Sequence, residues 1–368
     1  MTANSSDPID LAVGLHTEAM DAHDRGDAPA AKALSARAVA LLERHAGRDH
    51  PDTANARNLL SKLHLEEMDH RTAERLARAS VAGLRRCRRS GTSPDIDRIY
   101  VQSLQALGAA IRVSARYAAA YAQMKRTLAV AKRLLGPRDP DVASCLNDLG
   151  MLCKYWGRFP EGRRWYAKSL ALTIETSGPD SSETATLYHN LAGIEHTAQN
   201  FAAAVEPGRR SVEVREKALG RGHPAWAADV AQLGAILDAV GETSEAERCY
   251  REAIGVFRKH HGRDHYEVGF NYGNLATLKA GQGKLREAKR LYERGLAIME
   301  RALGRQHPET ALFRQNLGTV LRDLGDRAGA RRLIAASHKV LLAKLGAAHP
   351  NTRACKSNLD GLRARPAR

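Results

Sequence analysis

Residues 304–318 read GRQHPETALFRQNLG, and the same phrase stands at 262–276 as GRDHYEVGFNYGNLA and at 220–234 as GRGHPAWAADVAQLG. Each copy begins with a glycine, places a histidine three positions later, and ends with an amide, a leucine and a small residue. The interval is 42 residues each time. A fixed period of this length is typical of a repeat array, whose units stack on their neighbours without surrounding one spherical core.

Two series of punctuation residues divide each period into two helices. Glycine suits the end of a helix because it adopts the left-handed conformation without strain. A proline follows most glycines of the first series by four positions and suits the first turn of the next helix. Each unit therefore consists of a glycine stop, a short link, helix A, a tight turn and helix B. The first series is Gly136, Gly178, Gly220, Gly262, Gly304 and Gly346; the second is Gly157, Gly241, Gly283 and Gly325, with Gln199 at the expected fifth position.

Small residues recur where helices A and B must approach closely. A larger side chain at such a position would push the helices apart, at a cost of about 1–3 kcal/mol. Leucines fill the neighbouring column and form the expected core. The small column is Gly108, Gly150, Ala192, Gly234, Ala276 and Gly318; the leucines are Leu107, Leu149, Leu191, Leu233, Leu275, Leu317 and Leu359.

This layout resembles the tetratricopeptide repeat, and its 42-residue form is most similar to the repeats of kinesin light chains. The stretches that carry the resemblance are DPDVASCLNDLGMLCKYWGRFPEG at 139–162 and HYEVGFNYGNLATLKAGQGKLREAKRLYERGLAIMERALG at 265–304. The resemblance implies an all-α fold, a right-handed superhelical solenoid of about eight helix-turn-helix repeats with a C-terminal capping helix. We expect a disordered N-terminus at 1–7, degenerate repeats at 8–135, regular repeats at 136–346, and a capping helix with a basic tail at 347–368.

One unit departs from the pattern. FAAAVEPGRRSVEV at 201–214 places Pro207 and Gly208 inside an expected helix B over residues 202–218. An interior proline costs roughly 3 kcal/mol and kinks or breaks a helix. The sequence therefore predicts a kink or break here, which could serve as a hinge between the two halves of the array.

An amide precedes the repeated leucine in most units, although asparagine is unfavourable inside a helix. Its neighbours on the same helix face are mostly small, which leaves the amides clear to grip an extended backbone. In related tetratricopeptide superhelices, asparagines at this column line the concave groove and hold peptide backbones. The alternative is that these amides bond neighbouring helices and fix the superhelix. The predicted ladder is Asp148, Asn190, Gln232, Asn274, Asn316 and Asn358, where Asp148 departs from the pattern because it offers acceptors only.

Residues beside the ladder would set selectivity. Several of them are cationic, which favours acidic ligands, although aspartates share the face. The selectivity residues are Asn147, Lys154, Tyr155, His189, His196, Asp238, Gln315 and Arg322.

The chemistry of the remaining residues argues against an enzyme. The sequence shows no phosphate-binding glycine loop, nucleophile elbow or paired-carboxylate motif. Histidines at 223, 265, 307 and 349 recur at the link before helix A, so they are interpreted as turn residues and not as metal ligands. The five cysteines lack CxxC spacing, which indicates a reducing compartment. We expect no catalytic residues, cofactor or metal.

The net charge of +16 is compatible with nucleic acid or an anionic surface as a partner. Most basic residues occupy outward helical positions, however, which indicates a solvated surface. No apolar run reaches the roughly 20 residues that span a bilayer, and no signal peptide is apparent. The sequence predicts a cytoplasmic scaffold that binds a peptide segment or partner protein. A sensor of a short signalling peptide and a basic nucleic-acid or anionic-surface binder are the alternatives, and the oligomeric state is left open.

Overall fold

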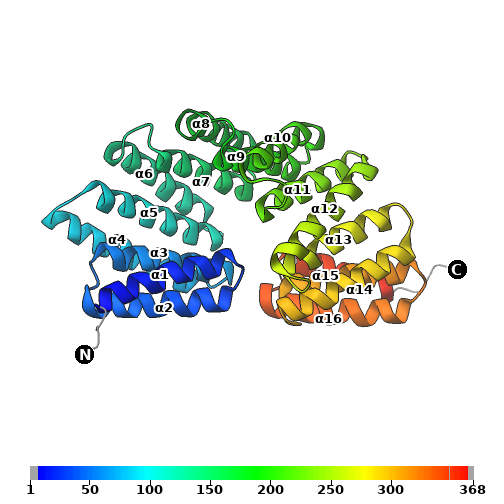
Figure 1. Ribbon diagram of the computed structural model, residues 1–368. Helices are drawn as coiled ribbons and strands as arrows, with labels where there is room; N and C mark the ends of the chain where they lie inside the picture. The colour runs from blue at the N-terminus through cyan, green and yellow to red at the C-terminus, as the bar shows by residue number, and fades with distance from the viewer. Residues whose placement is uncertain (1–6, 348, 364–368) are drawn as a thin grey trace, which may run out of the picture. The chain divides into compact units, whose positions relative to one another are not determined.

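The computed structural model describes residues 7–347 and 349–363, and all regular structure in them is helical (Figure 1). Seventeen α-helices are present in these residues, which corresponds to eight helix pairs followed by one last helix. The prediction of an all-α helical-repeat solenoid with a capping helix is confirmed. Residues 1–6 of the disordered start expected at 1–7 lie outside the described residues, whereas Asp7 is described and caps α1. Residues 364–368 of the expected basic tail also lie outside the described residues.

The chain divides into two compact units, and the first ends at Asn200. This unit holds four complete helix pairs and the A helix of a fifth. Odd-numbered helices are A helices and even-numbered helices are B helices. The helices of the first unit are α1 (Pro8–Asp24), α2 (Ala28–His45), α3 (Pro51–Glu66), α4 (His70–Ser90), α5 (Pro94–Val113), α6 (Tyr117–Leu134), α7 (Pro140–Trp156), α8 (Phe159–Ser177) and α9 (Ser182–Thr197).

The second unit begins at Phe201 with a B helix and ends with the capping helix. Its helices are α10 (Phe201–Leu219), α11 (Pro224–Ala239), α12 (Thr243–His261), α13 (Tyr266–Gly281), α14 (Leu285–Ala302), α15 (Pro308–Asp323), α16 (Arg327–Leu345) and α17 (Pro350–Arg363).

Left-handed residues end the helices as the sequence predicts. Every glycine of the two predicted series has a positive φ, and Gln199 adopts φ 61° at the turn where glycine was expected. Met68 (φ 64°) and Ala115 (φ 57°) play the same part in the degenerate N-terminal repeats. A left-handed residue therefore stands at every link between the described helices except that between α4 and α5, where Gly91 has an extended φ of 163°.

The recurrent histidines cap the A helices. In His223 and His307, Nδ1 accepts a hydrogen bond from the backbone N–H two residues later, at 3.1 and 3.2 Å. His50, His265 and His349 make the same bond at 3.2–3.4 Å. These bonds satisfy helix N-terminal N–H groups that have no intrahelical partner.

Close packing of A against B explains the small-residue column. A Cβ built on Gly150 would lie 2.6 Å from Tyr166, and one built on Gly318 would lie 2.7 Å from Ile334. Tyr166 and Ile334 are fully buried. The absence of a side chain at these glycines is what lets the bulky residue of helix B reach the backbone of helix A.

Of the predicted kink or break at Pro207, the break is wrong, and a kink without a break stays a prediction. Helix α10 runs without interruption from Phe201 to Leu219, with Pro207 inside it. The carbonyl that loses its partner through the proline belongs to Ala203, which is exposed, so water can satisfy it. The two compact units meet in sequence at the turn before α10, not within this helix.

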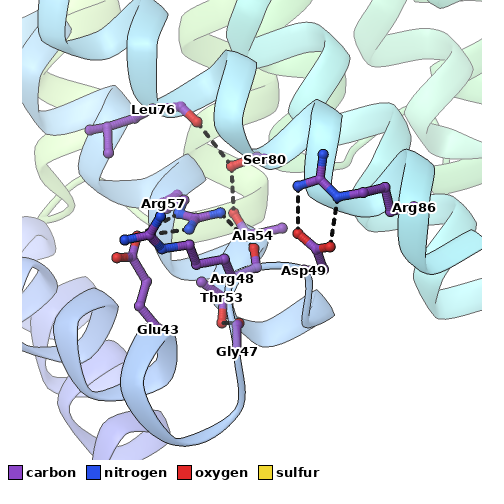
Figure 2. Close-up of polar contacts among 10 residues, drawn as sticks. All are labelled: Glu43, Gly47, Arg48, Asp49, Thr53, Ala54, Arg57, Leu76, Ser80 and Arg86. Atoms are coloured by element: carbon purple, nitrogen blue, oxygen red, sulfur yellow. Dashed lines mark hydrogen bonds and ion pairs between the residues drawn. The ribbon is translucent and has the colours of Figure 1, made fainter.

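Polar side chains fix the link between α2 and α3 (Figure 2). The guanidinium of Arg57 is 4% exposed; Nη2 donates to Glu43 at 2.7 Å and Nη1 to the Arg48 carbonyl at 2.9 Å. The hydroxyl of Thr53 donates to the Gly47 carbonyl at 2.8 Å. We call Arg57, Glu43 and the Arg48 carbonyl the link clamp. Arg314 repeats it in the second unit with Glu300 (2.8 Å) and the carbonyl of Arg305 (3.4 Å).

Candidate functional site

The A helices form the inner side of each unit. Contacts between alternate helices join α1 to α3, α3 to α5, α5 to α7 and α7 to α9 in the first unit, and α11 to α13 and α15 to α17 in the second. Because the A helices approach one another in this way, the A side lies on the inside of the stack. We call the A-helix side of each unit its inner face.

Polar side chains connect successive A helices across the inner face of the first unit. Asn58 Nδ2 donates to Ser103 Oγ at 2.9 Å, which joins α3 to α5. Gln105 Nε2 donates to Asp148 at 3.0 Å, which joins α5 to α7. Asn190 Nδ2 donates to Asn147 Oδ1 at 2.8 Å, which joins α7 to α9. These contacts match the alternative in which amides bond neighbouring helices.

Asp148 has an unusual environment for a carboxylate. Burial raises its pKa to about 6, against smaller opposing effects from the Gln105 hydrogen bond and the charge of Arg112. An acceptor-only side chain is stabilised by an N–H donor and a positive charge, which Gln105 and Arg112 supply. A groove of about 350 Å³ runs beside it, lined by polar residues that include Asn58, Gln102 and Gln105.

A row of three basic residues lies at the C-terminal ends of successive A helices in the first unit: Arg112 on α5, Lys154 on α7 and His196 on α9. Burial and the nearby Arg112 charge lower the pKa of Lys154, and burial and Lys154 lower the pKa of His196. No carboxylate among the described residues lies within ion-pair distance of Arg112 or Lys154. We call these three residues the basic row.

Tyr155 holds two members of the basic row together. The Arg112 guanidinium carbon lies 5.0 Å from the Tyr155 ring centroid and the Lys154 ammonium 5.4 Å from it. The ring itself is 55% exposed. Cation–π contacts of this kind position like charges side by side without neutralising them. Arg112 and Lys154 are thus two half-buried cations beside an exposed aromatic ring, and an anionic group could stabilise them.

The inner face of the second unit differs from that of the first. Asn274 and Asn358 make no side-chain hydrogen bond to any other described residue, and Asn316 is exposed beside the hydroxyl of Tyr292. Gln232 is half-buried on α11. Phe270, one turn before Asn274 on α13, is 43% exposed. This face offers amides next to apolar surface, in contrast to the charged face of the first unit.

The remaining predicted selectivity residues are dispersed. His189 is half-buried on α9. Burial raises the pKa of Asp238, at the end of α11. Gln315 is 9% exposed, and Arg322 pairs with its chain neighbour Asp323 at 2.8 Å. Of the predicted residues, the structure brings Asp148, Lys154, Tyr155 and His196 into one cluster and Asn147 into contact with Asn190.

Sequence reasoning missed Arg112 and Gln105. Arg112 precedes Lys154 by one 42-residue period, as Lys154 precedes His196, so extending the column into the degenerate repeats would have found it. Gln105 occupies the position before the expected amide, where Asn147 and His189 stand in the next two repeats. Its contact with Asp148 depends on the inter-helix distance, which the sequence does not give.

The described residues contain no group of three or more His, Cys, Asp or Glu side chains arranged to hold a metal ion. None of their helices is both long enough and apolar enough to cross a membrane.

Stacked helix pairs with a polar inner face define a helical-repeat protein of the class that serves as a protein–protein interaction scaffold. Models of the tetratricopeptide repeat match residues 99–161, 156–217, 225–301 and 272–343, and a second model of the same repeat matches residues 16–52. These matches cover well over half of the chain. The chain belongs to the tetratricopeptide repeat family, as the sequence analysis predicted.

Several curated relatives are fungal proteins named clustered mitochondria protein homolog. Those from Coccidioides immitis and Ajellomyces capsulatus are each 26% identical to this chain over 182 residues. The match covers 50% of this chain but only 14% of either relative. The likeness therefore concerns a repeat segment of a much longer protein.

Solved structures with the same fold cover more of the chain. BtubC (BKLC) from P. vanneervenii has a TM-score of 0.54 at 23% identity and covers 63% of this chain and 92% of its own. A Rap protein complexed with Competence and Sporulation Factor has a TM-score of 0.52 at 13% identity, with 96% and 98% covered. The apo form of RapI has a TM-score of 0.53 at 14% identity, and the match covers 78% of this chain and 97% of RapI. At these identities the likeness concerns the fold alone.

Proposed function

We propose that the protein is a non-catalytic scaffold that holds a segment of a partner protein against the inner faces of its units. The observation that carries this proposal is the basic row, in which Arg112 and Lys154 lie side by side with no carboxylate at contact distance. Two partly desolvated like charges are unfavourable. An anionic side chain of a bound segment would relieve this and gain charge-assisted hydrogen bonds.

The first unit would accordingly select an acidic segment. Asp148 stands near Arg112 but does not form a contact ion pair with it, so the guanidinium keeps its donors for a ligand. The exposed ring of Tyr155 supplies apolar surface beside the charges. Charge complementarity of this kind sets specificity and association rate.

The second unit would hold a segment by its backbone. Asn274, Asn316 and Asn358 each carry two donors and an acceptor, as an extended backbone requires. The exposed ring of Phe270 would contact an apolar side chain of the same segment. In the first unit, Asn190 is already bonded to Asn147. We therefore propose that Asp148 and Asn190 contribute less to holding the ligand than the amides of the second unit do.

An unbiased peptide library tests this proposal. We expect the wild-type protein to enrich peptides that contain acidic residues, and the double variant Arg112→Gln/Lys154→Gln to lose that preference while melting at the wild-type temperature. The triple variant Asn274→Ala/Asn316→Ala/Asn358→Ala should weaken capture of the remaining peptides. The matched control is Arg286→Gln/Arg290→Gln, which removes two exposed charges from α14 outside the inner face. A library that yields no enriched peptide with the wild-type protein would sink the proposal.

The alternative of a regulatory sensor for a short signalling peptide rests on the fold it shares with the Rap protein complexed with Competence and Sporulation Factor. It differs from the scaffold in its ligand, a free peptide and not a segment of a larger protein. Affinity capture from the native host would separate the two, because a scaffold retains an intact protein. The remaining alternative is a basic protein that binds nucleic acid or an anionic surface. Salt dependence tests it, because binding to nucleic acid weakens steeply as the salt concentration rises.

A further inference from the structure

The link between α12 and α13 departs from the link clamp described above. In the clamp, a glutamate stands four residues before the link glycine (Glu43, Glu300) and an arginine ten residues after it (Arg57, Arg314). Around Gly262 these two columns hold Arg258 and Tyr272. Arg258 thus stands where the clamp has a glutamate, and Tyr272 stands where it has the arginine that the glutamate binds.

A cavity of about 220 Å³ occupies this place in the second unit. Four arginines line it, and Val268, Tyr272, Ala297 and Ile298 provide apolar wall. The four arginines come from three elements: Arg258 from α12, Arg263 from the link, and Arg294 and Arg301 from α14.

The charge in this cavity is unbalanced. Asp264 is the single acidic residue among those that line it, and its carboxylate accepts from Arg301 at 2.7 Å. The same Asp–Arg contact occurs in the first unit between Asp49 and Arg86 (Figure 2), so it belongs to the repeat framework. Arg258, Arg263 and Arg294 have no carboxylate of the described residues within ion-pair distance. Arg294 instead lies over the ring of Tyr272, 4.6 Å from its centroid.

Helix capping does not account for this arrangement. A cation at the C-terminal end of α12 interacts favourably with the last carbonyls, which explains Arg258. Arg263 and Arg294 lie outside that last turn. The cavity also borders Val268, in the first turn of α13, where the helix dipole adds positive potential.

We propose that this cavity binds a phosphate monoester carried by a phosphorylated serine or threonine of a partner protein. A monoester presents three terminal oxygens and close to two negative charges, which several guanidinium forks can bind together. Nucleic acid and other polyanions need cations repeated along a track. Here three arginines without a carboxylate partner among the described residues line one cavity of about 220 Å³.

Calorimetric titration of the full chain with O-phosphoserine, in chloride buffer free of phosphate, tests this site. We expect phosphoserine to bind, serine not to bind, and inorganic phosphate to compete. In the double variant Arg258→Gln/Arg263→Gln, affinity should fall about tenfold or more, because charge-assisted hydrogen bonds are lost. Neither arginine has an ion-pair partner that the change would orphan. The single variant Arg263→Gln, at an exposed link residue, should also weaken binding and guards against misfolding of the double variant.

The matched control Arg286→Gln/Arg290→Gln removes the same charge from exposed positions on α14 that do not line the cavity, and should change the affinity less than twofold. Equal losses in the control and the cavity variant would show binding to net charge and would overturn the proposal. So would unchanged phosphoserine affinity in both Arg263 variants, or tight binding of single-stranded DNA or anionic vesicles that phosphoserine does not displace.

Discussion

The side-chain amide of Asn190 donates a 2.8 Å hydrogen bond to Oδ1 of Asn147, and so joins α9 to α7. Both residues were predicted from sequence to face a ligand. The bond shows that at least this rung of the proposed ladder contributes to the packing of helices. Asn274, at the same column in the second unit, makes no such bond within the described residues. The same column can therefore serve packing in one unit and remain available for a ligand in the other.

Alanine substitutions should separate these two roles. Asn190→Ala is expected to lower the free energy of unfolding by about 1 kcal/mol, because it removes a net-favourable hydrogen bond and leaves Asn147 without its donor. Asn274→Ala should be neutral or slightly stabilising, since alanine favours the helix. Urea denaturation followed by circular dichroism measures both. Equal losses in the two variants would mean that Asn274 also packs structurally.

Turn residues with a positive φ give a second prediction. Gln199 adopts φ 61° at the turn between α9 and α10, where five other repeats have glycine. Gln199→Gly should raise the unfolding free energy by about 1 kcal/mol, because glycine relieves left-handed strain. Gln282 is the control: it ends α13 at φ −79°, so Gln282→Gly should destabilise. The melting temperatures of both variants test this prediction. If both substitutions raised the melting temperature, relief of left-handed strain could not explain the effect at Gln199.

The regular repeats were predictable because glycine, proline and small residues are required by backbone geometry at defined positions. The same geometry persists at Met68 and Ala115, where the sequence gives no glycine to announce it, so the early repeats were judged irregular. A break at Pro207 was wrongly predicted because the cost of an interior proline depends on whether the freed carbonyl meets water. Side-chain pairs such as Gln105 with Asp148 depend on the approach of helices far apart in the chain, which periodicity alone does not determine.

Small residues in the packed column predict a third result. Gly150→Ala should lower stability by about 1–3 kcal/mol, because the new Cβ would overlap the buried ring of Tyr166. Gly255 lies in the exposed interior of α12, with nothing within 4 Å of an added Cβ. Gly255→Ala should therefore raise stability by up to about 1 kcal/mol through helix propensity. A stabilising Gly150→Ala would contradict the packing account of this column.

The raised pKa of Asp148 predicts how stability depends on pH. Burial raises this carboxyl from 3.8 to about 6, so between these values the native state binds more protons than the unfolded chain. The contribution of Asp148 to stability therefore decreases as pH rises through this window. Asp148→Asn removes the buried charge and retains an oxygen that can accept from Gln105. The pKa shift corresponds to at most roughly 3 kcal/mol of stability. Because the side chain is partly exposed, we expect Asp148→Asn to raise the free energy of unfolding by about 1 kcal/mol.

Melting curves at about pH 4 and about pH 8 would measure this effect, since the two values bracket the window in which the native carboxyl titrates. Asp148→Asn should melt above the wild-type protein at the higher pH and close to it at the lower, where the native carboxyl is already neutral. Asp21→Asn is the control for the loss of one carboxylate from an exposed position on α1. If Asp148→Asn destabilised the protein at the higher pH, the attraction of Arg112 would outweigh burial. Asp148 would then be a fixed anion that partly neutralises the basic row, and a bound acidic segment would have to compete with it.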